Sequence, residues 1–220
     1  MILEDYVKRI VEAALSSSDA LSAGLALYTN GRQSVLYSVS KMKDALWHHK
    51  SSESEAIIGT IDAFPTTDNA HGPSYGGLEI TQCAAQKGYG PLLYDFVMSW
   101  GKPIMPDRES VSPSASSIWM HYYADRPDVK KLRLDDIDDP KTPDPNDDSW
   151  YHKKGTKETD LCVPLNYAYA GSGNPCTELL AAHEELCGTF ERLGVIQRKN
   201  FETLLRMTGN RYFLKRYRTG

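Results

Sequence analysis

The strongest candidate for a binding site in this sequence is a glycine-rich turn between two apolar runs. Residues 78–95 read LEITQCAAQKGYGPLLYD. Alternation over 78–83 predicts a strand, and the apolar run from Pro91 predicts a helix with proline in its first turn. Gly88 and Gly90 have no Cβ, so backbone N–H groups and the positive end of a helix could approach a phosphate closely. The spacing predicts a pyrophosphate-binding turn, with an ordinary tight strand-to-helix turn as the alternative.

These residues resemble the cofactor-binding motif of GNAT acyltransferases, Gln/Arg-x-x-Gly-x-Gly/Ala, at which that family binds the pyrophosphate of acetyl-coenzyme A. Ala85 stands where the motif has Gln or Arg, and Pro91 removes an amide that could donate to phosphate. The charge of Lys87 can compensate. The resemblance implies acetyl-CoA as cofactor, bound by Thr81, Cys83, Gln86, Lys87, Gly88, Tyr89 and Gly90.

A second helix is expected to begin at Ser112, a good N-cap that a proline follows at the first helical position. In GNAT proteins an Asn-x-x-Ala helix follows the fifth strand and presents a tyrosine near the coenzyme sulfur. Here Ser112 replaces the Asn, Ala115 matches, and Trp119 occupies the usual tyrosine position. The resemblance makes Tyr122 the candidate proton donor to the leaving thiolate, with Tyr123 next. The alternative is that these aromatic side chains are ordinary core.

The resemblance also suggests a general base and an acceptor site. Family members often place a carboxylate on the fourth strand, which makes Glu79 the candidate base; a solvent-facing or salt-bridged glutamate is the alternative. Asp107 and Arg108, just after the fifth strand, could line the acceptor site. The acceptor itself is expected to be an amine on a small molecule or a protein.

A different function is also open. The blocks KGYGPLLYDFVM and MPDRESVSPSASSIWMHYY are most similar to acetyltransferase-like proteins of tailed phages. The alternative hypothesis is a catalytically degenerate GNAT-fold module, associated with a virion or binding a phage structural protein through its C-terminal region. Residues 199–220 carry six basic side chains against one acidic and could dock onto an acidic partner, or form an amphipathic helix packed on the domain. The location would be the host cytoplasm or the virion.

The composition is that of a soluble globular protein. The 220 residues are 40% hydrophobic and 25% charged with a formal net charge of −4, which makes a nucleic-acid partner unlikely. No run approaches the roughly 18 apolar residues of a membrane span, and the N-terminus does not resemble a signal peptide. We therefore expect a cytoplasmic protein without a membrane partner. The four cysteines form no C-x-x-C pair, so we expect free thiols and no metal site.

The predicted fold is α+β: a GNAT-like mixed, mostly antiparallel central sheet flanked by helices, with a C-terminal helical extension. Residues 1–172 would form the acyltransferase domain, which includes an N-terminal helix and an acidic loop over 135–149, and residues 173–220 would form the extension with its basic tail. Asn30-Gly31 predicts a hairpin turn. Strands are expected over 21–28, 34–39, 56–64, 78–83, 102–106, 131–134 and 161–170, and helices over 3–16 and 41–50.

Overall fold

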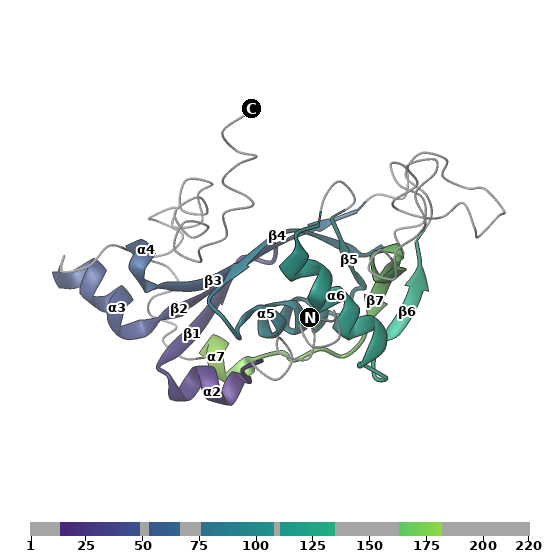
Figure 1. The fold of residues 1–220 in the computed structure, drawn as a ribbon. Helices are drawn as coiled ribbons and strands as arrows, with labels where there is room; N and C mark the ends of the chain where they lie inside the picture. The colour runs from purple at the N-terminus through teal and green to yellow at the C-terminus, as the bar shows by residue number, and fades with distance from the viewer. Residues whose placement is uncertain (1–13, 49–52, 67–75, 108–110, 135–162, 182–220) are drawn as a thin grey trace, which may run out of the picture. The chain divides into compact units, whose positions relative to one another are not determined.

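The computed structural model describes residues 14–48, 53–66, 76–107, 111–134 and 163–181 (Figure 1). Its strands are β1 (Leu25–Thr29), β2 (Gln33–Ser38), β3 (Ile57–Pro65), β4 (Leu78–Ala85), β5 (Ile104–Pro106), β6 (Lys130–Arg133) and β7 (Tyr167–Ala170). Its helices are α2 (Ser17–Ser22), α3 (Val39–Lys43), the π-helical η1 (Asp44–His48), α4 (Glu53–Ala56), α5 (Gly90–Met98), α6 (Pro113–Ala124), the 3-10 turn η2 (Val163–Asn166) and α7 (Thr177–Ala181).

The seven strands form one mixed sheet in the order β1-β2-β3-β4-β5-β7-β6. A mixed sheet with helices confirms the expected α+β class. The described residues divide into two compact units. Unit 1 holds those within 63–81 and 95–174, and unit 2 holds those within 14–62, 82–94 and 175–181.

A β-hairpin lies at the start of the sheet in unit 2. β1 and β2 pair antiparallel with Thr29 opposite Ser34, and the Asn30 N–H donates to the Gln33 carbonyl at 3.1 Å. The Asn30 side chain accepts from the Gln33 N–H at 2.7 Å. Gly31 has a φ of 83°, which glycine adopts without a Cβ clash. The predicted hairpin is therefore confirmed.

The strand expected from residue 21 begins later, at Leu25, because residues 17–22 form α2. Ser16 caps this helix: its hydroxyl accepts from the Asp19 N–H, and the Asp19 carboxylate accepts from the Ser16 N–H at 2.9 Å. This reciprocal pair is a capping box in which Asp takes the place of Glu. The Ser-x-x-Asp spacing was visible in the sequence but was interpreted as the end of a preceding helix.

A helical insertion separates β2 from β3. The helix predicted over 41–50 begins at Val39 and continues through η1 to His48, and residues 49–50 lie outside the described residues. Apolar side chains of the hairpin, α3, the end of α4 and the start of β3 form a buried cluster: Ala26, Tyr28, Val35, Tyr37, Val39, Met42, Ala56 and Ile57.

Unit 1 contains the parallel part of the sheet. β4 and β5 run parallel, with Leu78 opposite Ile104, and β7 pairs antiparallel with both β5 and β6. The strand predicted over 161–170 is shorter: residues 163–166 form η2 and only 167–170 form β7. Pro164 has no N–H to offer a strand ladder, which accounts for the late start.

Several expectations fall wholly or largely outside the described residues: the helix over 3–16, the acidic loop over 135–149 and the extension beyond residue 181. The proposed domain boundary therefore stays a prediction. Within the part of the chain that the structure describes, no helix is long and apolar enough to cross a membrane.

Candidate functional site

The predicted cofactor turn lies between β4 and α5, in unit 2. The Tyr89 N–H donates to the Gln86 carbonyl at 3.1 Å, which closes a four-residue turn. Gly88 is its third residue and has a φ of 94°. A type II turn needs a positive φ at that position, so glycine is required there for a backbone reason. The strand, turn and helix predicted from sequence are all present.

The turn leaves hydrogen-bond donors at the start of α5. The Gly88 carbonyl accepts from the Leu15 N–H at 3.0 Å, and the first helical bond runs from the Leu93 N–H to the Tyr89 carbonyl at 3.3 Å. Among the described residues, none accepts a hydrogen bond from the N–H of Gly88 or Gly90. The helix dipole adds partial positive charge at the same end, and these donors suit an anion.

Close packing against β3 fixes the end of β4. A Cβ on Gly59 would lie 2.9 Å from the Ala85 Cβ and 3.0 Å from Leu93 Cδ1. The Gln86 N–H also donates to the Ile58 carbonyl at 2.8 Å. Ala85, at the first motif position, therefore packs against β3. A longer Gln or Arg side chain at this position would have to displace β3.

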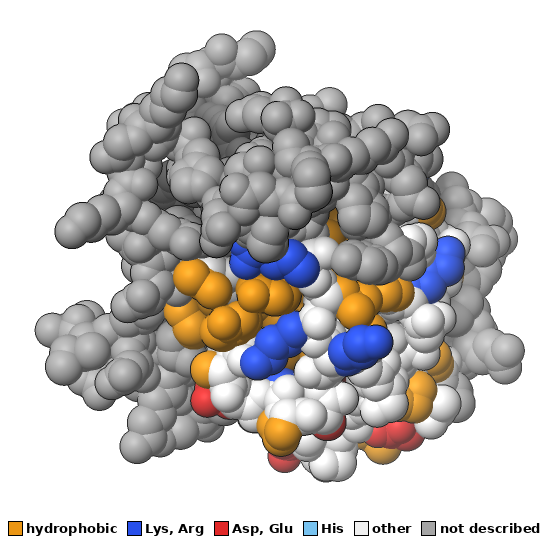
Figure 2. Space-filling view, turned by 90° about the vertical axis from the view of Figure 1, so that its right-hand side faces the viewer, with side chains coloured by type: hydrophobic (Ala, Val, Ile, Leu, Met, Phe, Trp, Pro, Cys, Tyr) orange, Lys and Arg blue, Asp and Glu red, His pale blue; other side chains and the backbone are white. Residues whose placement is uncertain are grey.

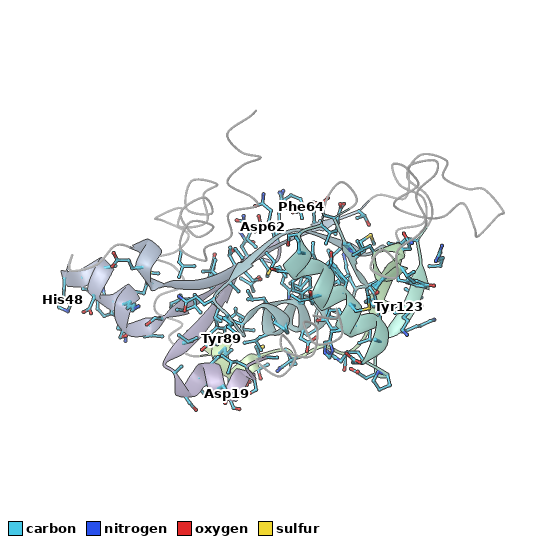
Figure 3. All side chains as sticks on the ribbon, viewed as in Figure 1. Asp19, His48, Asp62, Phe64, Tyr89 and Tyr123 are labelled. Carbon is cyan, nitrogen blue, oxygen red and sulfur yellow. The ribbon has the colours of Figure 1, made fainter. Side chains whose placement is uncertain are left out.

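The side chains that follow Ala85 are accessible. Gln86 and Lys87 are exposed, whereas Gly88, Tyr89 and Gly90 are half-buried. Tyr89 is labelled in Figure 3. The charge of Lys87 is thus open to solvent one residue before the left-handed glycine. Their role in binding the cofactor stays a prediction.

A buried polar cluster that sequence reasoning missed lies near the same strand. Asp62 on β3 is buried, and its Oδ2 accepts from Gln33 Nε2 at 3.1 Å (Figure 3). Burial raises the pKa of the Asp62 carboxyl, although the Gln33 hydrogen bond and the Arg32 charge act in the opposite direction. The only sequence signal was one acidic residue in the apolar run IIGTIDAF.

Cys83, a predicted cofactor-binding residue, belongs to the same cluster. The residue as a whole is half-buried. Burial of its thiol and, secondarily, the charge of Asp62 raise the pKa of Cys83 to about 12. Because the thiolate is the reactive form, this thiol is a poor nucleophile.

Glu79 and Thr81 lie on the part of β4 that belongs to unit 1, and both are half-buried. Leu78 and Ile80 are buried on either side of Glu79, so the predicted alternation is confirmed and Glu79 lies on the opposite face of the sheet from theirs. Its backbone register in the parallel pair places it opposite Met105. The role of general base stays a prediction.

The helix predicted after the fifth strand is present as α6. The Ser112 hydroxyl accepts from the Ala115 N–H at 3.2 Å, with proline at the first helical position, as expected. Trp119 is buried and stacks on Tyr169, with ring centroids 5.4 Å apart. Tyr122 is also buried, and its hydroxyl donates to Asp95 Oδ1 at 2.7 Å.

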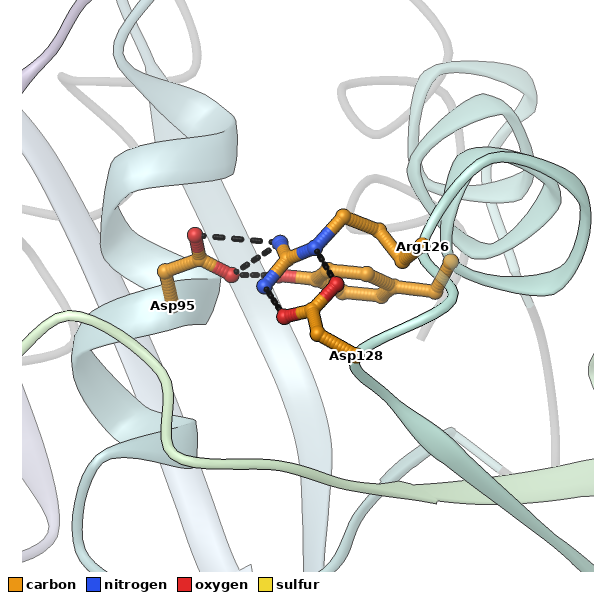
Figure 4. A network of polar contacts seen from close by, with 4 residues as sticks. Asp95, Arg126 and Asp128 are labelled. Carbon is orange, nitrogen blue, oxygen red and sulfur yellow. Dashed lines mark hydrogen bonds and ion pairs between the residues drawn. The ribbon is translucent and has the colours of Figure 1, made fainter.

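Arg126 extends this contact into a network in unit 1 (Figure 4). Its Nη1 donates to Asp95 Oδ1 at 2.9 Å. Its Nε and Nη2 donate to the two Asp128 oxygens at 2.8 and 2.7 Å. Hydrogen bonding to Asp128 and the charge of Asp95 raise the pKa of Arg126, and the pKa of Asp128 is lowered in turn. No local sequence pattern indicates this network, because Asp95 and Arg126 are 31 residues apart in the chain.

The remaining predicted residues are more dispersed. Tyr123 is half-buried and contacts Tyr167, with ring centroids 5.4 Å apart (Figure 3). Asp107 is half-buried directly after β5, and Arg108 lies outside the described residues. In the described part of the chain, no three His, Cys, Asp or Glu side chains come together as a group that could hold a metal ion.

Comparison with known proteins gives no relative: no family model, no curated protein and no solved structure matches this chain.

Proposed function

We propose that this protein is an N-acyltransferase, which transfers an acetyl group from acetyl-CoA to an amine acceptor by direct attack in a ternary complex. The observation that carries the proposal is the turn between β4 and α5. There the N–H groups of Gly88 and Gly90 have no acceptor among the described residues and lie at the positive end of a helix. A pyrophosphate is the kind of anion that such donors bind, and Lys87 supplies a nearby positive charge.

The order of the elements supports the same function. The turn follows the fourth strand and the capped helix α6 follows the fifth, as the GNAT resemblance implies. β4 and β5 run parallel, whereas the other pairs for which a register is defined are antiparallel. The mixed sheet supports the proposal at the level of fold class.

The proposed chemistry needs few groups from the protein. The neutral amine attacks the thioester carbonyl, the C–N bond forms, the C–S bond breaks, and the coenzyme leaves as a thiolate. Glu79 would take the proton that the attacking nitrogen loses, and Tyr122 or Tyr123 would protonate the thiolate. Holding the two reactants together supplies much of the rate. The Tyr122 hydroxyl donates a hydrogen bond to Asp95. This hydrogen bond would have to break before Tyr122 could protonate the thiolate.

Calorimetric titration of the full chain with acetyl-CoA tests the cofactor site, with free CoA and desulfo-CoA as comparison ligands. We expect micromolar binding that Gly88→Trp abolishes. The matched control is Gly31→Trp, since Gly31 has a similarly positive φ of 83° and open space around it. Absence of binding at millimolar acetyl-CoA, or equal binding by Gly88→Trp and the wild type, would remove the site assignment.

A specific observation favours the second candidate, a GNAT-fold module without turnover. Trp119 holds the position of the family tyrosine but is buried in the aromatic core, and the Tyr122 hydroxyl is held by a carboxylate. Such a module would act as a virion-associated or protein-interaction component. Binding of acetyl-CoA without acetyl transfer to any amine in a broad acceptor screen would favour it over the enzyme.

A further inference from the structure

β6, the strand at one end of the strand order, is rich in positively charged residues. Three of its four residues are basic: Lys130 and Lys131, which are exposed, and Arg133, which is half-buried. Among the strands that the structure describes, β6 stands at the end of the order and neighbours only β7. Figure 2 shows lysine and arginine side chains gathered with hydrophobic side chains on one face of the molecule.

The backbone of β6 presents hydrogen-bonding groups on its outer edge. The Leu134 N–H donates to the Asn166 carbonyl at 2.9 Å, so Leu134 is turned toward the β7 side of the ladder. Hydrogen-bonding direction alternates along an antiparallel strand. Leu132, opposite Ala168, therefore also faces β7, whereas Lys131, opposite Tyr169, turns its N–H and carbonyl outward. No described residue bonds to these two groups of Lys131.

Aromatic rings hold two of the three cations in place. Lys131 Nζ lies 4.5 Å from the ring centroid of Tyr123, and Arg133 Cζ lies 5.3 Å from that of Tyr167. Arg133 Nη1 also donates to the Tyr167 hydroxyl at 3.4 Å. Tyr123 and Tyr167 contact each other. Side chains fixed in this way lose less conformational freedom when a partner binds than freely moving ones would.

The positive charge of β6 limits the kinds of partner that could bind its outer edge. A second copy of β6 would place lysine and arginine opposite lysine and arginine, which is unfavourable across strands. A single-stranded nucleic acid would need open aromatic faces for its bases, but both tyrosine rings are engaged by each other and by the cations. An extended acidic segment satisfies both the outward backbone groups and the positive charge.

We propose that β6 is a docking edge for an extended, acidic peptide segment of a protein partner, which adds to the sheet as a strand beside Lys131. The peptide backbone would exchange hydrogen bonds with the Lys131 N–H and carbonyl. Its carboxylates would lie against Lys131 and Arg133, which are two residues apart in the strand and therefore on one face of the sheet. β6 belongs to unit 1 and the cofactor turn to unit 2, and the two share no residue, so the proposal does not depend on acetyl transfer.

Fluorescence anisotropy with the full chain tests the proposal. The probe is a labelled seven-residue peptide, Thr-Glu-Val-Glu-Val-Glu-Thr, and the comparison probes are the same peptide with Lys for Glu and a short oligothymidylate. We expect the acidic peptide to bind, and the other two probes to bind at least about tenfold more weakly. Binding should weaken as salt concentration rises.

Two substitutions at one position separate charge from backbone. Lys131→Gln keeps the amide and should weaken binding about two- to fivefold, as expected for one cross-strand charge pair. Lys131→Pro also removes the outward N–H, which the β6–β7 ladder does not use, and should weaken binding about tenfold or more. Lys43→Gln, which removes a charge in unit 2, should change nothing.

Amide hydrogen exchange of the wild type provides a readout that does not depend on a variant folding. The Lys131 amide should exchange quickly in the free protein and become protected with the acidic peptide bound, while the Leu132 and Leu134 amides are protected in both states. Three results would overturn the proposal: no binding of the acidic peptide, unchanged Lys131 exchange on binding, or oligothymidylate binding as tightly as the peptide.

Discussion

The Tyr122 hydroxyl on α6 donates a 2.7 Å hydrogen bond to Asp95 Oδ1 on α5, and Arg126 Nη1 binds the same oxygen at 2.9 Å. The Asp95 carboxylate on α5 thus binds both Tyr122 within α6 and Arg126 just after the end of α6. These groups are partly or fully buried, so the loss of one partner leaves the other without a full set of hydrogen bonds.

This relationship predicts coupled stability effects in a double-mutant cycle. Tyr122→Phe removes one hydrogen bond and should lower the free energy of unfolding by about 1 kcal/mol. Asp95→Ala also leaves Arg126 with one carboxylate fewer and should lower it by about 2–3 kcal/mol. The double variant should lose less than the sum, with a coupling of about 0.5–3 kcal/mol, measured by urea denaturation. Additive effects would show that the hydrogen bond between Tyr122 and Asp95 contributes nothing to stability. The control is the exposed Asp125→Ala, which should lower the free energy of unfolding by no more than about 1 kcal/mol.

Gly173 is predicted to be irreplaceable for two reasons. It has a φ of 57°, and a Cβ there would overlap the Asp95 carbonyl oxygen and lie 2.5 Å from the Ser99 nitrogen. Gly173→Ala should therefore lower the free energy of unfolding by about 2–4 kcal/mol, the left-handed backbone and the overlap both contributing. Gly101→Ala is the control, because Gly101 has a φ of 76° with open space and should cost only about 1 kcal/mol. Equal losses in thermal or chemical unfolding would mean that close packing at Gly173 does not matter.

Asp62 should give a pH-dependent contribution to stability. Burial raises its pKa in the folded state above that in the unfolded chain, so the contribution of the carboxyl to folding is fully present at acid pH and is lost as the pH rises through the folded-state value. Asp62→Asn keeps an oxygen that can accept from Gln33 and should be more stable than the wild type at pH 7.

The difference between Asp62→Asn and the wild type should shrink as the pH falls through the acid range toward about pH 4. Chemical denaturation at a series of pH values measures it. The exposed Asp44→Asn provides the matched charge change as the control. A constant difference at all pH values would contradict the raised pKa of Asp62.

Cys83 should be unreactive until the protein unfolds. A rise of its pKa from the ordinary 9.0 to about 12 lowers the thiolate fraction at mild pH by about a thousandfold. Alkylation with iodoacetamide, followed residue by residue with mass spectrometry, should be slower by about that factor in the native protein than in guanidinium. Rapid native labelling of Cys83 would contradict the burial of its thiol.

Glu79→Gln should separate binding from turnover if the protein is an acyltransferase. The substitution removes the proposed proton acceptor and should slow acetyl transfer by about a hundredfold or more, while the affinity for acetyl-CoA in calorimetry stays unchanged. Because a general base acts only when it is ionised, the difference in rate between the wild type and Glu79→Gln should shrink at low pH. The exposed Glu55→Gln is the control and should keep the wild-type rate; a Glu79→Gln variant with that same rate would remove Glu79 from the mechanism.

Features that depend on local backbone chemistry can be predicted from the order of the residues alone. Gly88 was predicted at a turn from the glycine spacing between a strand and a helix, and its positive φ is one that glycine adopts readily. Ser112 was predicted as a cap because a hydroxyl can accept from an N–H three residues on. The Asn30-Gly31 hairpin is of the same kind. In each case the interacting atoms are a few residues apart, so the order of residue types is enough to predict them.

Contacts between side chains that are far apart in the sequence depend instead on how the strands and helices pack. Asp95 and Arg126 are 31 residues apart in the chain, Asp62 and Gln33 are 29 apart, and no local pattern indicates either pair. The same holds for Ala85, whose small size follows from the approach of Gly59 on the neighbouring strand. Burial and long-range pairing set the partners and pKa values of these groups, and both depend on how the whole sheet and its helices pack.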